Sequence, residues 1–231
     1  MPRMARLLID GGAYHVLMRG NNSQVIFHEP ADYQRYLQQL LAYKREHALK
    51  VYHFALMPNH VHLILEVQVG QELSRAMLGL NLSYALSYRK RHEYNGHLWQ
   101  GRFKSLLIDK DSYLLECGRY VELNPVRAGL VQKPETYPWT SYRVYAQGFD
   151  NPLVDQNPLY ETLGATPTER QQQYKRFIYD GFRQALPEGF LRHRFLGSPS
   201  FVKHLEAQFG LPAVNRRRGR PGKVVAVTNE K

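Results

Sequence analysis

Short β-prone runs alternate with longer helical patterns in the first hundred residues. Residues 13–18 and 50–56 are rich in branched and aromatic side chains and predict strands. Residues 57–66 predict a further strand, which Met57 and Pro58 enter with a bend, because proline fixes φ and has no amide donor. The last two runs are close enough in the chain to pair as an antiparallel hairpin.

Leucines and tyrosines that recur every three or four positions predict two helices. The first covers residues 30–47, with Asp32 in the first turn, where the helix dipole favours negative charge. The second covers residues 71–94. Residues 97–109 predict another strand region. The order β-α-β-β-α-β indicates an α+β fold of ferredoxin-like type, with an antiparallel sheet, helices on one face and the other face left for a substrate.

A third helix is predicted to begin near Asp111 or Ser112, either of which suits a cap. At 100° per residue, the side expected to pack on the sheet carries Leu114, Gly118, Val121 and Ala128. The opposite side is a polar stripe formed by Tyr113, Cys117, Tyr120, Asn124 and Arg127. Because Pro125 removes a helical hydrogen bond, the helix either kinks there or Asn124 caps a new turn.

The remaining third of the chain predicts a small helical extension. A Pro-, Gly- and Asn-rich stretch, 148–158, follows the main domain and resembles a linker or long loop. A capping box at 166–169 starts a helix expected to reach Arg183, and another helix should run from Ser198 to Gly210. We therefore divide the chain into a domain of residues 1–147, an extension of residues 148–215 and a basic tail of residues 216–231.

The net charge says more about the class of binding partner than the rest of the composition does. The chain has 43% hydrophobic and 22% charged residues, an ordinary globular balance. Its formal charge is +11, of which the tail carries +5 and the other residues +6, so nucleic acid is the expected partner. In the tail, Arg218 and Arg220 flank Gly219 as in an AT-hook, a minor-groove binder, although a merely solvated tail has the same composition.

Cysteine use and hydropathy indicate a cytoplasmic protein. Cys117 is the single cysteine, which excludes an internal disulfide and a multi-cysteine zinc site. An apolar run of 18 residues and an N-terminal apolar signal core are both lacking in the sequence. We therefore expect no membrane partner.

The predicted strand that carries His60 and His62 contains candidate metal ligands. Alternate residues of a strand share a face, so the two imidazoles point the same way and form two arms of a metal site. Two half-buried strand histidines are the alternative reading. With the amide oxygen of Asn124, the two imidazoles would leave a divalent ion with open positions, where it can polarise a phosphodiester. A neighbouring phenol, Tyr120, can then attack the phosphorus.

Two long motifs resemble those of single-tyrosine HUH transposases, and within them the REP-associated tyrosine transposases. They are MPNHVH at 57–62 and YVELNPVRAGL at 120–130, and YHV at 14–16, RGN at 19–21 and WQGRF at 99–103 also match. The similarity covers roughly residues 10–145. It implies that His60 and His62 are metal ligands, that Asn124 is a third ligand, and that Tyr120 is the nucleophile.

The resemblance also implies the reaction and its partners. Family members cut single-stranded DNA near a hairpin, leave a 5′-phosphotyrosine link and a free 3′-OH, and use Mg²⁺ or Mn²⁺. The candidate DNA-binding residues are Arg19, Asn21, Asn22, Arg102, Lys104, Arg127, Arg218 and Arg220. The long extension favours a monomer over a domain-swapped dimer, and a nucleoid-associated location in a bacterium is expected. A hairpin-binding regulator that does not cut, and a metal nuclease that uses water, are the alternatives.

Overall fold

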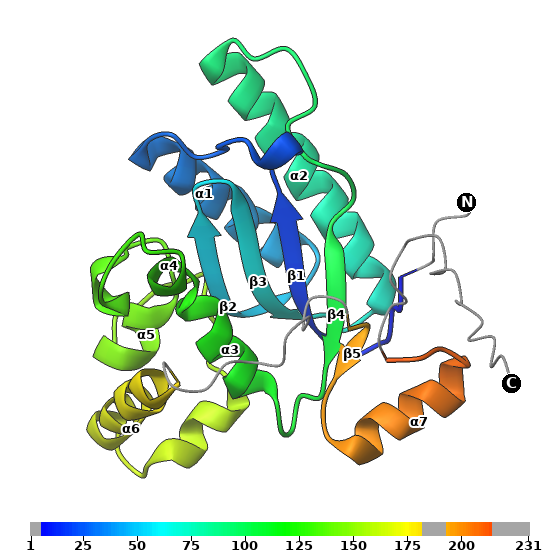
Figure 1. The fold of residues 1–231 in the computed structure, drawn as a ribbon, viewed down its shortest axis with the longest axis vertical. Coiled ribbons are helices and arrows are strands. Elements are labelled where there is room, and N and C mark those ends of the chain that lie inside the picture. Colours follow the sequence, from blue (N-terminus) through cyan, green and yellow to red (C-terminus); the bar gives the residue numbers. More distant parts are fainter. Residues whose placement is uncertain (1–5, 182–192, 214–231) are drawn as a thin grey trace, which may run out of the picture.

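The protein folds around a five-stranded mixed sheet, seen in a computed structural model that describes residues 6–181 and 193–213 (Figure 1). The strand order is β2-β3-β1-β4-β5, and all neighbours are antiparallel except β4 and β5. The strands are β1 (Ala13–Arg19), β2 (Lys50–Met57), β3 (His60–Glu66), β4 (Lys104–Ile108) and β5 (Phe195–Leu196). The predicted antiparallel hairpin and the α+β class are confirmed, with β5 as a parallel addition.

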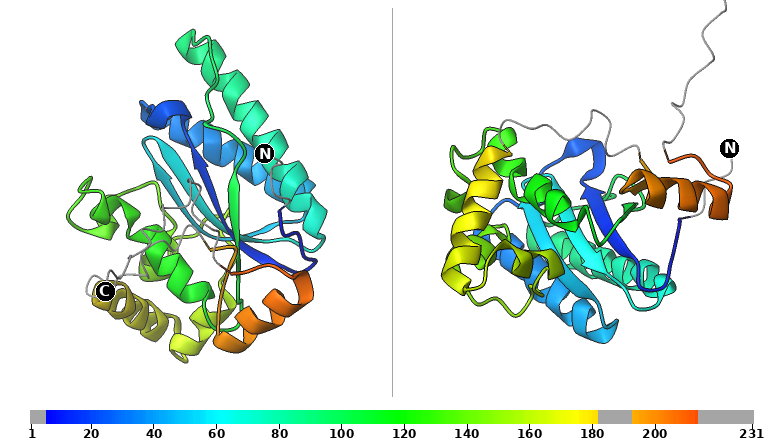
Figure 2. Two further views of the ribbon diagram at one scale, coloured as in Figure 1. Left: turned by 45° about the vertical axis from the view of Figure 1, so that its right-hand side comes forward. Right: turned by 90° about the horizontal axis from the view of Figure 1, so that it is seen from below.

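Two long helices cover one face of the sheet. They are α1 (Pro30–Glu46) and α2 (Gly70–His92), which pack over the largest apolar core. The opposite face is not wholly open, because α3 (Leu114–Glu122) packs there against β2 and β3 (Figure 2). This face of the sheet is therefore covered by α3 over β2 and β3.

The predicted strand region at 97–109 is shorter than expected. Only Lys104–Ile108 form β4, while Trp99 makes an isolated bridge to Gly20. The Trp99 indole donates to the Asn81 carbonyl at 2.9 Å, and Phe103 is buried in the core. Both aromatic side chains are thus used for packing.

The C-terminal part joins the same body. Its helices are α4 (Asn124–Arg127), α5 (Tyr142–Gln147), α6 (Pro167–Asp180) and α7 (Pro199–Phe209), with 3-10 turns η2 (Pro134–Thr136) and η3 (Pro158–Leu163). A further 3-10 turn, η1 (Asn21–Ser23), follows β1 near the start of the chain. The predicted capping box of Thr166 and Glu169 starts α6, which ends at Asp180 instead of reaching Arg183. A third apolar cluster joins Leu123 to Tyr174, so the extension packs directly on the elements around α3.

The described residues contain no helix with the length and apolar character needed to cross a membrane.

Candidate active site

The strand β3 presents its two motif histidines on the face that α3 covers in part. Val61 and Leu63 point into the core beneath α1 and α2, so His60 and His62 point the other way, as predicted. In the register of β1, Arg19 lies opposite His60 and Leu17 lies opposite His62. The positively charged Arg19 therefore lies directly beside the His60 imidazole.

Helix α3 is held against the sheet by a glycine and a buried carboxylate. A Cβ on Gly118 would lie 2.5 Å from the His53 ring, so only glycine permits this close approach. Glu122 is fully buried, and it accepts hydrogen bonds from Ser141 at 2.6 Å and Tyr174 at 2.7 Å while contacting His53 Nδ1 at 2.9 Å. Glu122 thus faces away from the imidazoles, as the helical spacing indicates.

The same helix brings Tyr120 to the histidines. The Tyr120 ring centroid lies 5.9 Å from that of His62 in an edge-on arrangement, and the His60 and His62 centroids are 4.9 Å apart. The Arg127 guanidinium lies 5.2 Å from the centroid of the Tyr120 ring. Groups sixty residues apart in the chain therefore meet at one point, with a phenol, two imidazoles and a cation.

A third histidine belongs to this group and was not predicted. His15 on β1 is buried, its Nε2 lies 2.8 Å from His62 Nδ1, and its ring stacks on that of His62 at 5.0 Å. It also meets Tyr120 edge-on at 5.9 Å. The sequence signal was present, because His15 shares a strand face with Arg19, but only the register of β1 against β3 places it beside His62.

Burial keeps these imidazoles neutral. Burial, with Arg19 nearby, lowers the pKa of His60 to about 4, and burial lowers the pKa of His15 to about 3. The pKa of His62 is also lowered well below its usual value by burial and by the other two histidines. Burial raises the pKa of Tyr120, an effect that Arg127 opposes. At neutral pH the site therefore holds uncharged imidazoles, each with a lone pair on one ring nitrogen, and a protonated Tyr120 phenol.

The chain kinks directly after Tyr120. Helix α3 ends at Glu122 and α4 begins at Asn124, because Pro125 cannot donate to the carbonyl of Val121. The Asn124 side-chain nitrogen replaces that donor, bonding the carbonyls of Tyr120 at 2.8 Å and Val121 at 3.1 Å. Its amide oxygen takes no part in these two bonds, which fix the Asn124 side chain next to Tyr120.

Three details of the predicted helix are wrong. The start has Tyr113 as cap without a side-chain bond, in place of Asp111 or Ser112. Cys117, expected on the polar stripe, is buried against the sheet, and Ala128, expected on the packed side, is exposed. The kink explains Ala128, since residues after it no longer follow the phase of α3.

The predicted DNA-binding loop borders the histidine strand. Asn21 and Asn22 are exposed in η1, and the Gly20 amide donates to the Asn59 carbonyl at 2.9 Å, next to His60. Arg19 is exposed as well. These side chains lie at the end of the sheet where the imidazoles stand.

The other predicted DNA-binding residues lie in three places. Lys104 is exposed on the same face and, with His15 and His193 of the extension, lines a cavity of about 20 Å³. Arg102 is exposed just before β4, and Arg127 lies over Tyr120. Arg218 and Arg220 lie outside the described residues.

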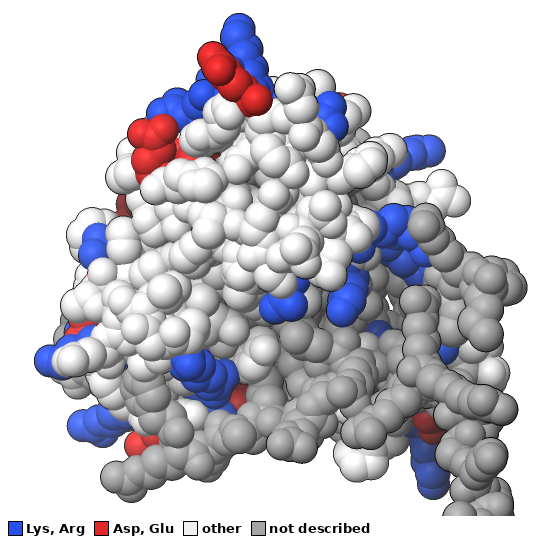
Figure 3. All heavy atoms as spheres, turned by 45° about the horizontal axis from the view of Figure 1, so that its top comes forward, with Lys and Arg blue, Asp and Glu red and all other residues white. Residues whose placement is uncertain are grey.

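Basic side chains do not form a single patch on the face that Figure 3 shows. Acidic side chains lie mainly near the upper and left borders of that view, and basic side chains are spread around a largely uncharged centre. On this face the basic side chains of the described residues are therefore spread over an extended surface, which suits contacts with a polyanion backbone.

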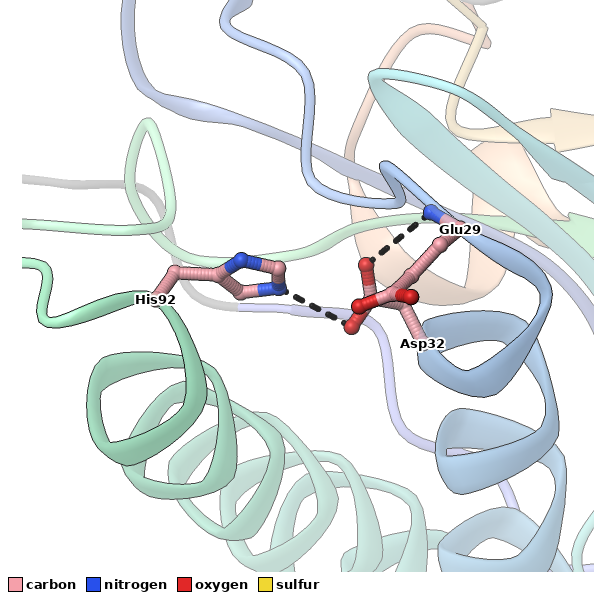
Figure 4. A group of neighbouring side chains, drawn as sticks. All are labelled: Glu29, Asp32 and His92. Carbon is pink, nitrogen blue, oxygen red and sulfur yellow. Dashed lines mark hydrogen bonds and ion pairs between the residues drawn. The ribbon is translucent and has the colours of Figure 1, made fainter.

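A second group of possible ligand atoms lies between α1 and α2. Among the described residues, only Glu29, Asp32 and His92 bring three His, Cys, Asp or Glu ligand atoms within 4.8 Å of one another (Figure 4). The buried Asp32 carboxylate is already used, accepting from the His28 amide at 2.8 Å and from His92 Nε2 at 3.0 Å, with Arg91 3.4 Å away. This group caps α1 and ties it to α2.

Comparison with known proteins agrees with this geometry. The family model described as "Transposase IS200 like" matches residues 9–124, half of the chain. A solved structure of a REP-associated tyrosine transposase bound to a REP hairpin is similar in fold, with a TM-score of 0.53 and 21% identity over 67% of this chain and 92% of that chain.

A second solved structure, a putative transposase from Deinococcus radiodurans R1, matches at 16% identity and a TM-score of 0.36 over 57% of this chain and 94% of that chain. No curated protein matches. The family match runs from before β1 to the first residue of α4, and thus includes His60, His62, Tyr120 and Asn124. The chain therefore belongs to the family of IS200-like transposases, enzymes that act on DNA.

Proposed function

We propose that this transposase is a metal-dependent endonuclease and strand transferase of single-stranded DNA, which acts at hairpin sequences through a 5′-phosphotyrosine intermediate. The observation that carries the proposal is the convergence of Tyr120 with His60 and His62 within one chain. A hairpin-binding regulator would not need a phenol beside two neutral imidazoles. Membership of the REP-associated subgroup is part of the proposal.

The donor set fits a divalent ion, Mg²⁺ or Mn²⁺. His60 and His62 would hold it through nitrogen, because burial leaves both imidazoles neutral, and the Asn124 oxygen is the proposed third ligand. Such an ion, when bound, polarises a phosphodiester oxygen and neutralises developing charge. Nitrogen donors favour Mn²⁺ in strength of binding, whereas open positions and oxygen donors also suit Mg²⁺.

The residues of the chain perform the following steps. The Tyr120 hydroxyl loses its proton to solvent water, and its oxygen forms a bond to phosphorus while the bond from phosphorus to the 3′-oxygen breaks. The leaving oxygen takes up a proton from solvent water to give a free 3′-OH. Arg127, beside the ring, stabilises the phenolate. Attack of a 3′-OH on the phosphotyrosine reverses these steps, rejoins the DNA and restores Tyr120.

DNA contacts are proposed for the residues around this point. Arg19, Asn21, Asn22, Lys104 and Arg127 are exposed near the imidazoles, and Arg102 is exposed at the entry to β4. The hairpin is proposed as substrate because the solved structure of similar fold is described as bound to a REP hairpin. We also propose that a monomer is active, since Tyr120 and the histidines of the same chain already meet.

A covalent adduct tests the proposal. Full-length protein is incubated with labelled single-stranded hairpin DNA and Mn²⁺ or Mg²⁺, then separated on a denaturing gel. We expect an adduct that is lost with chelator and in Tyr120→Phe, while Tyr113→Phe on the preceding turns still forms it. Cleavage without an adduct would indicate a water-dependent nuclease, and binding without cleavage would indicate a regulator.

Two further results test the assignment of Tyr120 and the proposal that one chain forms the site. Persistence of the adduct in Tyr120→Phe would refute the assignment of the nucleophile. A mixture of Tyr120→Phe with His62→Ala protein separates a monomer from a swapped dimer. If each site is formed by one chain, the mixture stays inactive, whereas recovered cleavage would show that the site is shared between chains.

A further inference from the structure

His15 is a buried histidine that the proposed reaction does not use. It comes from β1, its side chain is 2% exposed, and its Nε2 lies 2.8 Å from His62 Nδ1. Its ring touches both His62 and Tyr120. A histidine placed only to fill the core would not need a polar contact of this length with a residue of the site.

The geometry argues against His15 as a third ligand. Three ligands of one ion must bring their donor atoms close to a common point. Among the described residues, the group whose three ligand atoms lie within 4.8 Å of one another is Glu29, Asp32 and His92, so the nitrogens of His15, His60 and His62 do not come that close together. His15 instead contacts Nδ1 of His62, and Nε2 of His62 takes no part in that contact.

The tautomer of His62 decides whether it can bind a metal. A neutral imidazole has one nitrogen that donates and one that accepts. If His15 donated to His62 Nδ1, the proton of His62 would lie on Nε2, and that nitrogen could not be a ligand. If His62 Nδ1 donates to His15 Nε2, the lone pair of His62 Nε2 is available.

His60 has a matching contact. Its Nδ1 lies 2.6 Å from the side-chain oxygen of Asn59, which can only accept, so His60 Nδ1 donates. Nε2 is then the nitrogen left with a lone pair. The same assignment for His62 would give both motif histidines the same ligand atom.

We propose that His15 is a positioning residue, which accepts the Nδ1 hydrogen of His62 and thereby holds His62 in the tautomer and ring orientation that binds a divalent cation. The inference rests on the proposed function, because it concerns the same metal. Outer partners of metal-bound histidines act in this way, and their loss weakens metal binding by about 10–100-fold.

Metal affinity without DNA tests the inference. Mn²⁺ binding to full-length protein is measured by electron paramagnetic resonance for the wild type, His15→Phe and His15→Gln. Phenylalanine keeps the ring volume but cannot accept, and the glutamine amide places an oxygen near the former Nε2. We expect roughly 10–100-fold weaker binding for His15→Phe and recovery to within about threefold for His15→Gln. His28→Phe, in the contact between α1 and α2, is the control and should bind as the wild type does.

The tautomer itself is measured by long-range ¹H–¹⁵N NMR of the imidazole rings. We expect the His62 proton on Nδ1 in the wild type, and this measurement decides the matter if His15→Phe fails to fold. A proton on Nε2 would overturn the inference, as would unchanged binding in a folded His15→Phe. Loss of binding in His15→Gln equal to that in His62→Ala would make His15 a ligand and also overturn it.

The inference and the proposed function fail in different ways. If Mn²⁺ binds and depends on His15 but no adduct forms on DNA, the function is wrong and the positioning role stands. If an adduct forms with an unchanged metal requirement in His15→Phe, the function stands and the positioning role is wrong. Wild-type protein that binds no Mn²⁺ would overturn the positioning role.

Discussion

Two groups of histidines lie on opposite faces of the sheet and differ in their neighbours. The β1–β3 group, His15, His60 and His62, is buried next to Tyr120 and is made of nitrogen donors. The α1–α2 group, His28 and His92, lies beside Asp32, which both bind, through a backbone amide and a ring nitrogen. By the distances between ligand atoms alone, the second group is the better metal site.

For a metal site, it matters less how many ligand atoms lie close together than whether those atoms are already hydrogen-bonded within the protein. Every close contact of Asp32 goes to a hydrogen-bond donor of the protein, so a cation would have to displace Arg91 and His92. In the β1–β3 group, Nδ1 of each motif histidine has a partner, and Nε2 of each takes no part in these contacts. A site ready for a ligand keeps some of its donors unused.

Removing one ring from each group should give the largest contrast. His62→Ala should lower the rate of adduct formation by about 10³-fold, since a bound metal contributes several kcal/mol to the transition state. His92→Ala should change the rate by less than about twofold, because it lies on the other face. Single-turnover gels with both variants measure this. Equal losses in the two variants would remove the distinction between the groups.

Asp32 should matter for stability and not for chemistry. Asp32→Ala removes a 3% exposed carboxylate that accepts from two backbone amides and His92, and should lower the free energy of unfolding by about 3 kcal/mol. Urea unfolding of the variant gives the value, with Glu29→Ala as the less costly exposed control. A large loss of adduct formation by the folded fraction of Asp32→Ala would instead tie this group to catalysis.

The pH profile should report the phenol and not the histidines. Because burial raises the pKa of Tyr120 above its usual 10, the reactive phenolate should increase about tenfold per pH unit between about pH 6 and 9. The pKa of His60 is lowered to about 4, so its protonation should reduce metal binding only as the pH falls toward that value. Single-turnover rates measured against pH test both expectations, and a loss of metal binding near pH 6.5 would contradict the one for His60.

The smallest contrast concerns two arginines. Arg19, exposed beside His60, is a proposed phosphate contact, so Arg19→Ala should reduce the salt dependence of single-strand binding by about 0.7 in the logarithmic slope. Arg91 already bonds Glu29 at 2.7 Å and should leave the slope unchanged when replaced by alanine. Binding titrations at several salt concentrations compare the two. A larger change for Arg91→Ala would place DNA on the face of α1 and α2.

The sequence predicted elements better than it predicted contacts. The alternation of residues 60–66 and the period near 3.6 in α1 and α2 are local signals. Both are kept in the fold: Val61, Leu63 and Leu65 pack in the core under α1 and α2, whereas Ile64 packs in the other cluster. The helical phase of α3 could not be extrapolated across Pro125, because the kink changes which side of the chain is buried. Ala128 was therefore assigned to the packed side although it is exposed.

The sequence predicted that candidate residues would meet where they stand in a motif, and it missed residues whose place depends on strand register. His60, His62 and Tyr120 stand in two long motifs and meet in space. That His60, His62 and Asn124 are metal ligands and that Tyr120 is the nucleophile stay predictions. His15 is placed by the pairing of β1 with β3, and His193 by the addition of β5 to β4, which no pattern along the chain specifies.

Tyr120 and Glu122 are two residues apart, which sets them about 200° apart around α3. One meets the imidazoles and the other is tied to His53, Ser141 and Tyr174. Rotating the helix to swing the phenol outward would pull a buried carboxylate from three partners at once. We therefore expect Tyr120 to keep its position during the proposed reaction, so that the second DNA end must move to it.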